Sequence, residues 1–154
     1  MPKEKKKKKK LAKPTRKKLV DKADKLFSIY IRVHYADDDG YCRCYTCWTK
    51  LKWNDRNMNC WHFISRKCNN LRRDLNNARP QCFRPCNNKL QGNWEPVLFR
   101  INLVEEIWER KVRELENKYL LWKQDKTEVK TREIEDKIKE LEQLIIEESK
   151  RFKE

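Results

Sequence analysis

The sequence has little glycine or proline and no long apolar run. Only two glycines and five prolines occur in 154 residues, and charges of both signs are spread along most of the chain, which argues against a wholly disordered protein. No segment approaches the roughly 20 apolar residues that cross a bilayer, and the N-terminal lysine run lacks the apolar core of a secretion signal. We expect one modest domain with extensions, in the cytoplasm, with no membrane partner.

The seven cysteines favour a metal site over disulfides. An odd number of thiols at short spacings, in a reducing compartment, is typical of metal binding. Two close pairs stand about 35 residues apart, and four thiolates suit tetrahedral zinc, which leaves no open position for a reaction. Buried reduced thiols are the alternative, Cys42 could replace the first ligand, and Cys60 and Cys68 are predicted to be free. The predicted structural zinc ligands are Cys44, Cys47, Cys82 and Cys86.

The charge is strongly positive and unevenly placed. The formal net charge is +15, of which residues 1–18 carry about +10, residues 19–100 about +7 and residues 101–154 about −2. A polyanion partner fits this distribution, because each neutralised phosphate releases condensed counterions and adds salt-dependent affinity. The sign of the charge does not by itself separate DNA from RNA or a membrane surface.

The chain divides into three parts. Residues 1–14 form a like-charge block that we expect to be a disordered basic tail, either a solvated tail without a role or a nucleic-acid arm. Residues 15–100 comprise a predicted amphipathic helix from Thr15 to about His34, an aspartate-rich turn ending at Gly40, and the cysteine-rich part. Residues 101–154 show helical apolar spacing with a hinge near 125–127. Three interpretations of this apolar stripe stay open: it folds back on the domain, the two helical segments pair with each other, or the stripe dimerises.

A histidine and two asparagines surround the cysteine pairs in a recognisable order. His62 lies between the pairs, Asn77 stands five residues before Cys82, and Asn87 directly follows Cys86. This order matches the HNH, or His-Me finger, nuclease pattern with the last histidine replaced by asparagine. Phosphodiester hydrolysis needs a neutral imidazole to accept a proton from water and a hard divalent ion at the phosphate. Taken alone, His62 could instead be a satisfied core histidine, and the asparagines turn or cap residues.

Five segments together resemble the phage lambda NinG (Rap) recombination endonuclease family over nearly half of the chain. They are Lys22–Arg32, Gly40–Cys47, His62–Arg66, Asn77–Cys82 and Cys86–Asn93. The resemblance implies a phage- or prophage-encoded nuclease that acts in the bacterial cytoplasm on branched DNA such as Holliday junctions or D-loops, with structural zinc and catalytic Mg²⁺ or Mn²⁺. The expected fold is α+β: a small zinc-stapled ββα-metal core of the HNH, treble-clef-like type, flanked by an N-terminal helix and a long C-terminal helical extension.

The resemblance also implies roles for individual residues. His62 is the expected general base, Asn77 braces the loop that aims it, and Asn87 binds the catalytic ion. The sequence departs from the family at Trp48 and Trp61, where glycine is usual, and in a Cys82–Cys86 spacing that is one residue longer. The phosphate clamps are expected to be Arg66, Arg72, Arg73 and Arg79.

Three functions follow as hypotheses. The first is a structure-selective, metal-dependent DNA endonuclease, for which symmetric cleavage of a junction makes a homodimer attractive. The second is a catalytically inactive, zinc-stabilised DNA-binding accessory protein of recombination, motivated by Trp61 beside the histidine and by the scarcity of carboxylates. The third makes residues 101–154 a scaffold for a phage or host recombination protein.

Overall fold

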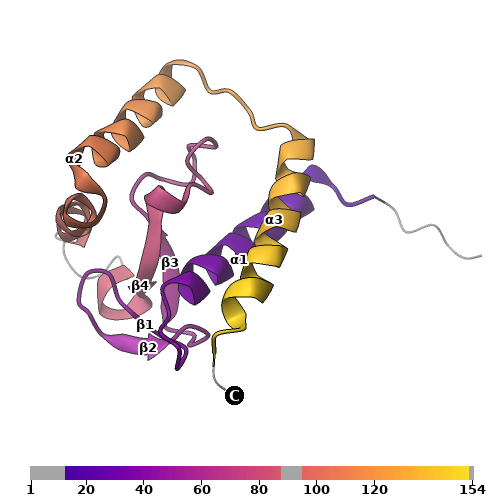
Figure 1. The fold of residues 1–154 in the computed structure, drawn as a ribbon. Coiled ribbons are helices and arrows are strands. Elements are labelled where there is room, and N and C mark those ends of the chain that lie inside the picture. The colour runs from indigo at the N-terminus through magenta and orange to yellow at the C-terminus, as the bar shows by residue number, and fades with distance from the viewer. Residues whose placement is uncertain (1–12, 88–94, 153–154) are drawn as a thin grey trace, which may run out of the picture.

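The computed structural model describes residues 13–87 and 95–152, and its class is α+β, as predicted (Figure 1). Within these ranges no helix is both long and apolar enough to span a membrane. Helices and short antiparallel ribbons alternate along the first half of the chain, and helices alone form the second half. The elements are α1 (Arg16–His34), β1 (Tyr41–Arg43), β2 (Lys50–Lys52), β3 (Met58–His62), η1 (Leu75–Asn77), β4 (Ala78–Cys82), η2 (Phe83–Asn87), α2 (Glu95–Gln124) and α3 (Thr131–Ser149).

Helix α1 confirms the helix predicted from Thr15 to His34. Thr15 has the extended backbone of an N-cap, and its hydroxyl accepts a hydrogen bond from the Lys18 N–H. The apolar side chains at three- and four-residue steps form one buried face of the helix. Residues 1–12 of the predicted basic tail lie outside the described residues.

The first ribbon is a short hairpin of β1 and β2, which we call the cysteine hairpin. It follows a turn in which the Asp37 carboxylate accepts the Tyr41 N–H and pairs with Lys50, so the predicted solvated turn is confirmed there. Gly40 takes a φ of +76°, which glycine adopts without steric cost. Trp48, just after the second cysteine of the hairpin, also has a positive φ of 62°. A left-handed residue is required at this position of the turn, which explains why glycine is expected there.

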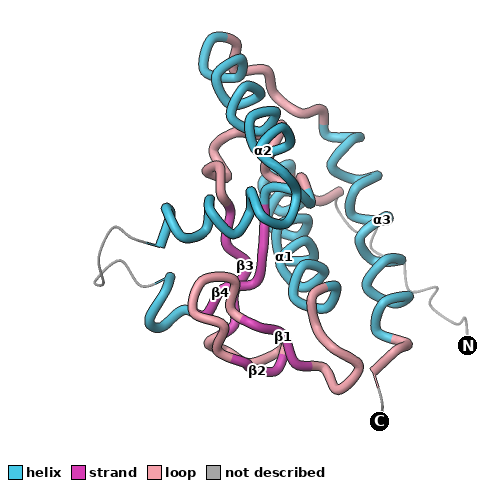
Figure 2. The backbone as a smooth tube through the Cα atoms, turned by 60° about the vertical axis from the view of Figure 1, so that its left-hand side comes forward, coloured by secondary structure: helices cyan, strands magenta, loops and turns pink. Residues whose placement is uncertain are grey.

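The second ribbon, β3 with β4, forms the middle of the molecule (Figure 2). In its antiparallel register Cys60 faces Pro80 and His62 faces Ala78, so these side chains share one face of the ribbon. Helix α1 packs on that face through Phe27. The opposite face carries Trp61, which packs against Phe99 of α2.

The C-terminal helices fold back on the rest of the chain, which is the first of the three predicted alternatives. Helix α3 runs beside α1, with Ile138 and Leu141 buried against it (Figure 1). Helix α2 bends at Trp108, which has φ 70° and ψ 147°, so that Phe99 before the bend and Val112 after it enter one core. Residues 101–154 therefore share hydrophobic cores with residues 15–100. Residues 125–130 separate α2 from α3, at the position of the predicted hinge.

A buried ion pair joins four elements at one point. The Arg79 side chain is 1% exposed, and its Nε donates to Glu106 of α2 at 2.9 Å. Its Nη1 donates to the carbonyls of Leu75 and Ala78. The hydroxyls of Tyr35, after α1, and Tyr45, in the cysteine hairpin, both donate to the same Glu106 carboxylate. We call this set the Arg79–Glu106 network.

We predict that Glu106→Gln lowers the free energy of unfolding by about 2 kcal/mol. Removing one member of a buried ion pair leaves the other charge uncompensated, and the loss is reduced here because the Glu106 side chain is 37% exposed. Urea denaturation measures the change. The control is Glu114→Gln, which removes only surface ion pairs with Arg110 and Lys111 and should leave the denaturation midpoint unchanged. Equal midpoints for the parent and Glu106→Gln would contradict the prediction.

Candidate functional site

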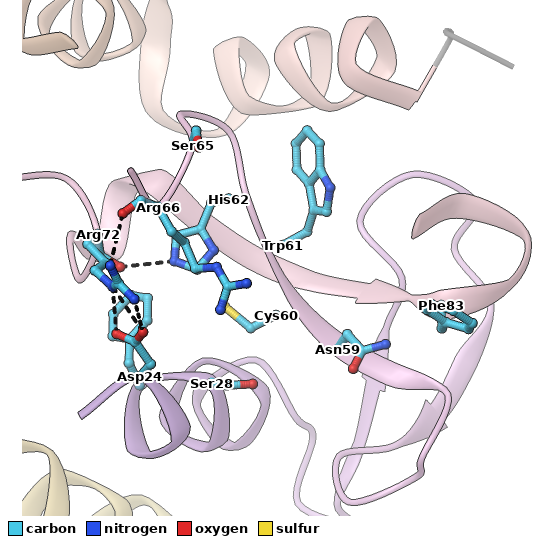
Figure 3. A pocket seen from close by; sticks show the side chains of 11 residues that line it. Asp24, Ser28, Asn59, Cys60, Trp61, His62, Ser65, Arg66, Arg72 and Phe83 are labelled. Carbon is cyan, nitrogen blue, oxygen red and sulfur yellow. Dashed lines mark hydrogen bonds and ion pairs between the residues drawn. The ribbon is translucent and has the colours of Figure 1, made fainter. Parts of the chain in front are cut away.

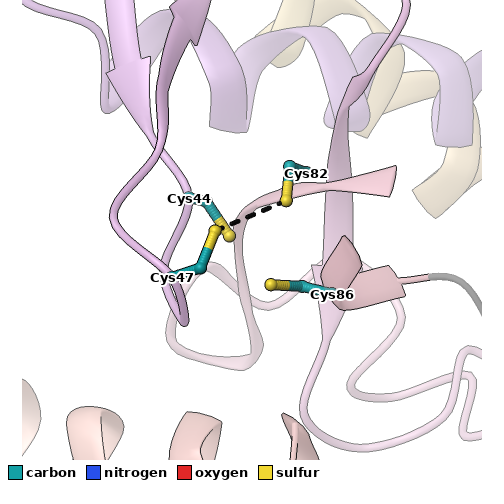
Figure 4. Close-up of side chains that lie close together, drawn as sticks. All are labelled: Cys44, Cys47, Cys82 and Cys86. Carbon is teal, nitrogen blue, oxygen red and sulfur yellow. Dashed lines mark hydrogen bonds between the residues drawn. The ribbon is translucent and has the colours of Figure 1, made fainter. Parts of the chain in front are cut away.

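The four predicted zinc ligands converge in space (Figure 4). The Sγ atoms of Cys44, Cys47, Cys82 and Cys86 all lie within 4.8 Å of one another, and those of Cys47 and Cys82 are 3.6 Å apart. Four sulfurs around one zinc at about 2.3 Å lie about 3.8 Å from each other, so the spacing fits a tetrahedral thiolate site. The cluster could hold a metal ion such as zinc, and the three-residue spacing of the second pair does not prevent convergence.

Neighbouring polar groups favour the thiolate form of Cys44, whereas burial raises the pKa of Cys82 and Cys86. Burial raises the pKa of the Cys44 thiol, but hydrogen bonds from the Cys47 N–H and the Thr46 hydroxyl outweigh it and bring the pKa to about 6. The buried Gln81 amide donates to the Thr46 hydroxyl at 3.1 Å and fixes its position. Cys42 lies in a different cluster with Met58, so it does not replace Cys44.

His62 lines an open pocket of about 620 Å³ on the α1 side of the second ribbon (Figure 3). Its Nε2 lies 2.9 Å from the backbone carbonyl of Arg72. A carbonyl can only accept a hydrogen bond, so Nε2 carries the proton and the lone pair of the neutral ring is at Nδ1. The ring is thus fixed in one tautomer, with one nitrogen left to accept a proton.

Burial keeps this imidazole neutral. It lowers the pKa of His62 to about 4, and the positive charges of Arg66 and Arg72 act in the same direction, while the bond to the Arg72 carbonyl opposes them. Near neutral pH the ring is therefore in the unprotonated form that a general base requires.

Asn77 ties together the loop that follows His62. Its side chain is fully buried, and its Oδ1 accepts the Ile64 N–H at 2.7 Å while its Nδ2 donates to the carbonyls of Ile64 and Leu71. These bonds join the two ends of residues 64–77, the segment that delivers the Arg72 carbonyl to His62. Asn77 does not line the pocket, so its contribution there is to hold the loop in place.

Asp24 of α1 is a pocket residue that the sequence reasoning missed. Its two carboxylate oxygens share the single Nε–H of Arg72, at 2.9 and 3.0 Å, and Oδ2 also accepts from Nη2 of Arg72 at 2.5 Å (Figure 3). The carboxylate also pairs with Arg73 at 2.7 Å. It therefore holds the residue whose carbonyl orients His62. The available signal was its place in the family-like segment Lys22–Arg32, beside the buried Ala23.

The four arginines predicted to contact phosphate have different surroundings. Arg66 and Arg72 line the His62 pocket, although Arg72 is already bound to Asp24. Arg73 is only 10% exposed and paired with Asp24, so it braces the loop. The expectation that Arg79 contacts phosphate is wrong for this fold, because its side chain is buried and its Nε and Nη1 donate to Glu106 and to two carbonyls inside the protein.

Trp61 does not crowd the histidine. Trp61 is among the residues that line the pocket, but successive residues of a strand point to opposite faces, so its indole points away from the His62 ring (Figure 3). The indole packs against Phe99 of α2, with the ring centroids 4.5 Å apart. Its bulk fills the core between β3 and α2. The side chain of Asn87, the predicted ligand of the catalytic ion, lies outside the described part of the structure.

Comparison with known families identifies a matching family. A family model described as the bacteriophage lambda NinG protein matches residues 1–147. The chain belongs to this family. The match extends well beyond the segments that carried the sequence resemblance and includes all of α2 and most of α3, so the C-terminal helices belong to the NinG-family pattern. No curated protein and no solved structure matches the chain.

We predict that the protein binds zinc at one ion per chain and that Cys82→Ala abolishes this binding. The three remaining cysteines cannot complete the tetrahedral site, so the metal no longer joins the cysteine hairpin to β4. Thermal unfolding should therefore also lose its cooperative transition. Metal content and circular dichroism provide the measurements. Cys68→Ala is the matched control, because Cys68 is equally buried but lies outside the cluster. Stoichiometric zinc in purified Cys82→Ala would refute the assignment.

We also predict that the His62 ring of the native protein stays neutral down to about pH 5. The folded pKa of about 4 lies below the value near 6.5 of an unfolded histidine, so the unfolded chain binds more protons between these values. The His62 contribution to stability is therefore complete above about pH 6.5 and is lost as the pH falls toward 4. Imidazole NMR titration of the parent and of His62→Gln tests this, and a His62 midpoint near 6.5 would exclude a buried, neutral ring.

Proposed function

We propose that the protein is a metal-dependent endonuclease that hydrolyses phosphodiesters in branched DNA, such as Holliday junctions or D-loops, with His62 as general base. The observation that carries the proposal is the state of His62: a neutral ring on the wall of an open pocket, with Nε2 bound to a carbonyl and Nδ1 left as the proton acceptor. The antiparallel pair of β3 and β4, with Cys82 of the four-cysteine cluster at the end of β4, supports the ββ part of a ββα-metal arrangement of the HNH type.

The residues of the pocket provide the steps of water activation. Nδ1 of His62 accepts a proton from the attacking water, and the Arg72 carbonyl stabilises the resulting imidazolium through the bond to Nε2. The negative charge of a bound phosphate raises the low pKa of His62, so the base becomes stronger when substrate is present. Arg66, which is exposed at the pocket, is placed to contact the phosphate.

The two metals have separate roles in this proposal. Zinc in the cysteine cluster is closed by four sulfurs and holds the fold. Mg²⁺ or Mn²⁺, when bound, supplies charge neutralisation at the phosphate and the leaving oxygen. Within the described ranges the cysteine cluster is the only group of three or more His, Cys, Asp or Glu side chains close enough to hold a metal ion. Asn87 remains the proposed protein ligand.

Branched DNA is proposed as the substrate because of the charge distribution together with the family. The excess positive charge lies in the tail and in residues 19–100, the part that holds the His62 pocket. Membership of the NinG family supports a phage-encoded protein of recombination. A homodimer and an association with phage or host recombination proteins are further parts of this proposal.

One observation favours the alternative of a catalytically inactive DNA-binding accessory protein. Asp24 is the carboxylate that lines the His62 pocket, and its oxygens already accept from Arg72 and Arg73. A catalytic ion would then depend on amide and hydroxyl oxygens such as those of Asn59 and Ser28. Trp61, the original reason for this alternative, no longer supports it, because its ring packs against Phe99.

Cleavage of a four-way DNA junction separates the two functions. With Mg²⁺ or Mn²⁺ the parent should cut the junction, and His62→Ala should cut it at least about 100-fold more slowly while binding it with unchanged affinity. The control is His34→Ala, which removes the other histidine, an exposed partner of Glu148. Junction binding without cutting by the parent would favour the accessory protein, and equal cutting by His62→Ala would exclude His62 as the base.

A further inference from the structure

A second pocket, of about 480 Å³, lies between the cysteine hairpin, the C-terminal end of α1 and α2. It shares no lining residue with the His62 pocket. Four residues of β3 line the His62 pocket, whereas Pro80 of β4 lines the second, so the two pockets lie along different strands of the central ribbon. Four aromatic rings line it, those of Tyr35, Tyr41, Tyr45 and Trp48. We call it the aromatic pocket.

The inner rings of this pocket are held rigidly. The Tyr35 and Tyr45 hydroxyls donate to the same Glu106 carboxylate, at 3.1 and 2.5 Å. The Tyr45 ring packs on Phe99 at 4.8 Å, and Asn102 donates to the Tyr45 carbonyl. Burial and the contacts with Glu106 raise the pKa of both phenols, so they remain neutral donors. The floor is therefore preorganised, which lowers the entropy lost when a flat ligand binds.

The outer rings are exposed and carry positive charge beside them. Trp48 is 58% exposed and Tyr41 36%, although large aromatic side chains usually pack inside. The Trp48 backbone keeps a positive φ, which costs free energy for any residue with a Cβ. The Nζ atoms of Lys50 and Lys52 lie 5.0 and 4.1 Å from the Tyr41 ring centroid. Lys50 also pairs with Asp37, and Lys52 donates to the Asp39 carbonyl, so a phosphate would compete with these exposed partners. Aromatic faces beside lysines are the combination that binds unpaired nucleotides.

We propose that the aromatic pocket binds an unpaired nucleobase of the DNA, with the adjoining phosphates on Lys50 and Lys52. Asp37, Glu105 and Glu106 line the pocket, so a phosphate inside it would be repelled. The Glu106 oxygens already accept from Tyr35, Tyr45 and Arg79, so Glu105 is the proposed acceptor for the amino group of a base such as adenine. The inference rests on the proposed function only in taking DNA as the ligand. Branched DNA offers unpaired bases at its branch point, and the base would be held along β4 while the scissile phosphate lies along β3.

Binding measurements test the base without requiring cleavage. In the His62→Ala background, without added divalent metal, fluorescence anisotropy compares a deoxyadenosine strand of about 12 nucleotides with an abasic strand of the same number of phosphates. The His62→Ala protein should bind the deoxyadenosine strand more tightly than the abasic strand. Adding Trp48→Gly should reduce this preference about tenfold while leaving the affinity for the abasic strand unchanged. Glycine suits the positive φ of residue 48, so this variant removes the ring without straining the turn.

Two further variants keep the test decisive. Tyr41→Leu removes a ring from strand β1 and should lower the same preference, whatever Trp48→Gly does to the turn. The matched control is Trp108→Gly, because Trp108 is also exposed, at 75%, and also has a positive φ, but lies on α2 outside the pocket. Equal binding of both strands, or full preference in both pocket variants, would overturn the proposal. Because only binding is measured, a preference for bases stands even if the parent cuts no junction.

Discussion

The described architecture depends on neutralising one buried charge. Arg79 lies in the middle of the molecule, and a guanidinium with so little solvent contact is tolerated only when it is paired and its donors are satisfied. Glu106 reaches it from α2, and two tyrosines reach Glu106 from the end of α1 and from the cysteine hairpin. One carboxylate thus fixes where three other elements stand relative to β4. The aromatic pocket is the outer side of this same network, so its shape follows from the pairing.

The cysteine cluster and the histidine pocket are linked through the second ribbon. Cys82 ends β4, and β4 in turn pairs with β3, whose last residue is His62. A metal at the cluster would therefore steady the strand that carries the proposed base, although it would take no part in the reaction. From the other side, Asp24 of α1 holds Arg72, and Arg72 holds the imidazole through its carbonyl. The base is positioned by two supports that lie far apart in the sequence.

The balance between an active nuclease and an accessory protein depends on the charge inside the His62 pocket. Arginines surround the only carboxylate that lines it, which makes the pocket attractive to a phosphate and less attractive to a cation. A bound phosphate alters this balance, because its oxygens would compete with Asp24 for Arg72. Under the proposed function, the pocket binds a DNA phosphate in the absence of a metal, and cutting requires that substrate and cation enter together.

Patterns local in sequence determined a large part of this protein. The apolar spacing of α1 predicted its helix, the spacing of four cysteines predicted their convergence, and five short segments between residues 22 and 93 together predicted the NinG family. Tertiary structure decided what local patterns do not contain. Arg79 is buried because α2 covers its face of β4, whereas Arg66 stays exposed in the loop after β3. Trp61 and His62 separate because neighbouring strand residues point to opposite faces. Asp24 pairs with Arg72, which lies 48 positions later in the sequence, and only the packing of α1 against the loop brings these two residues together.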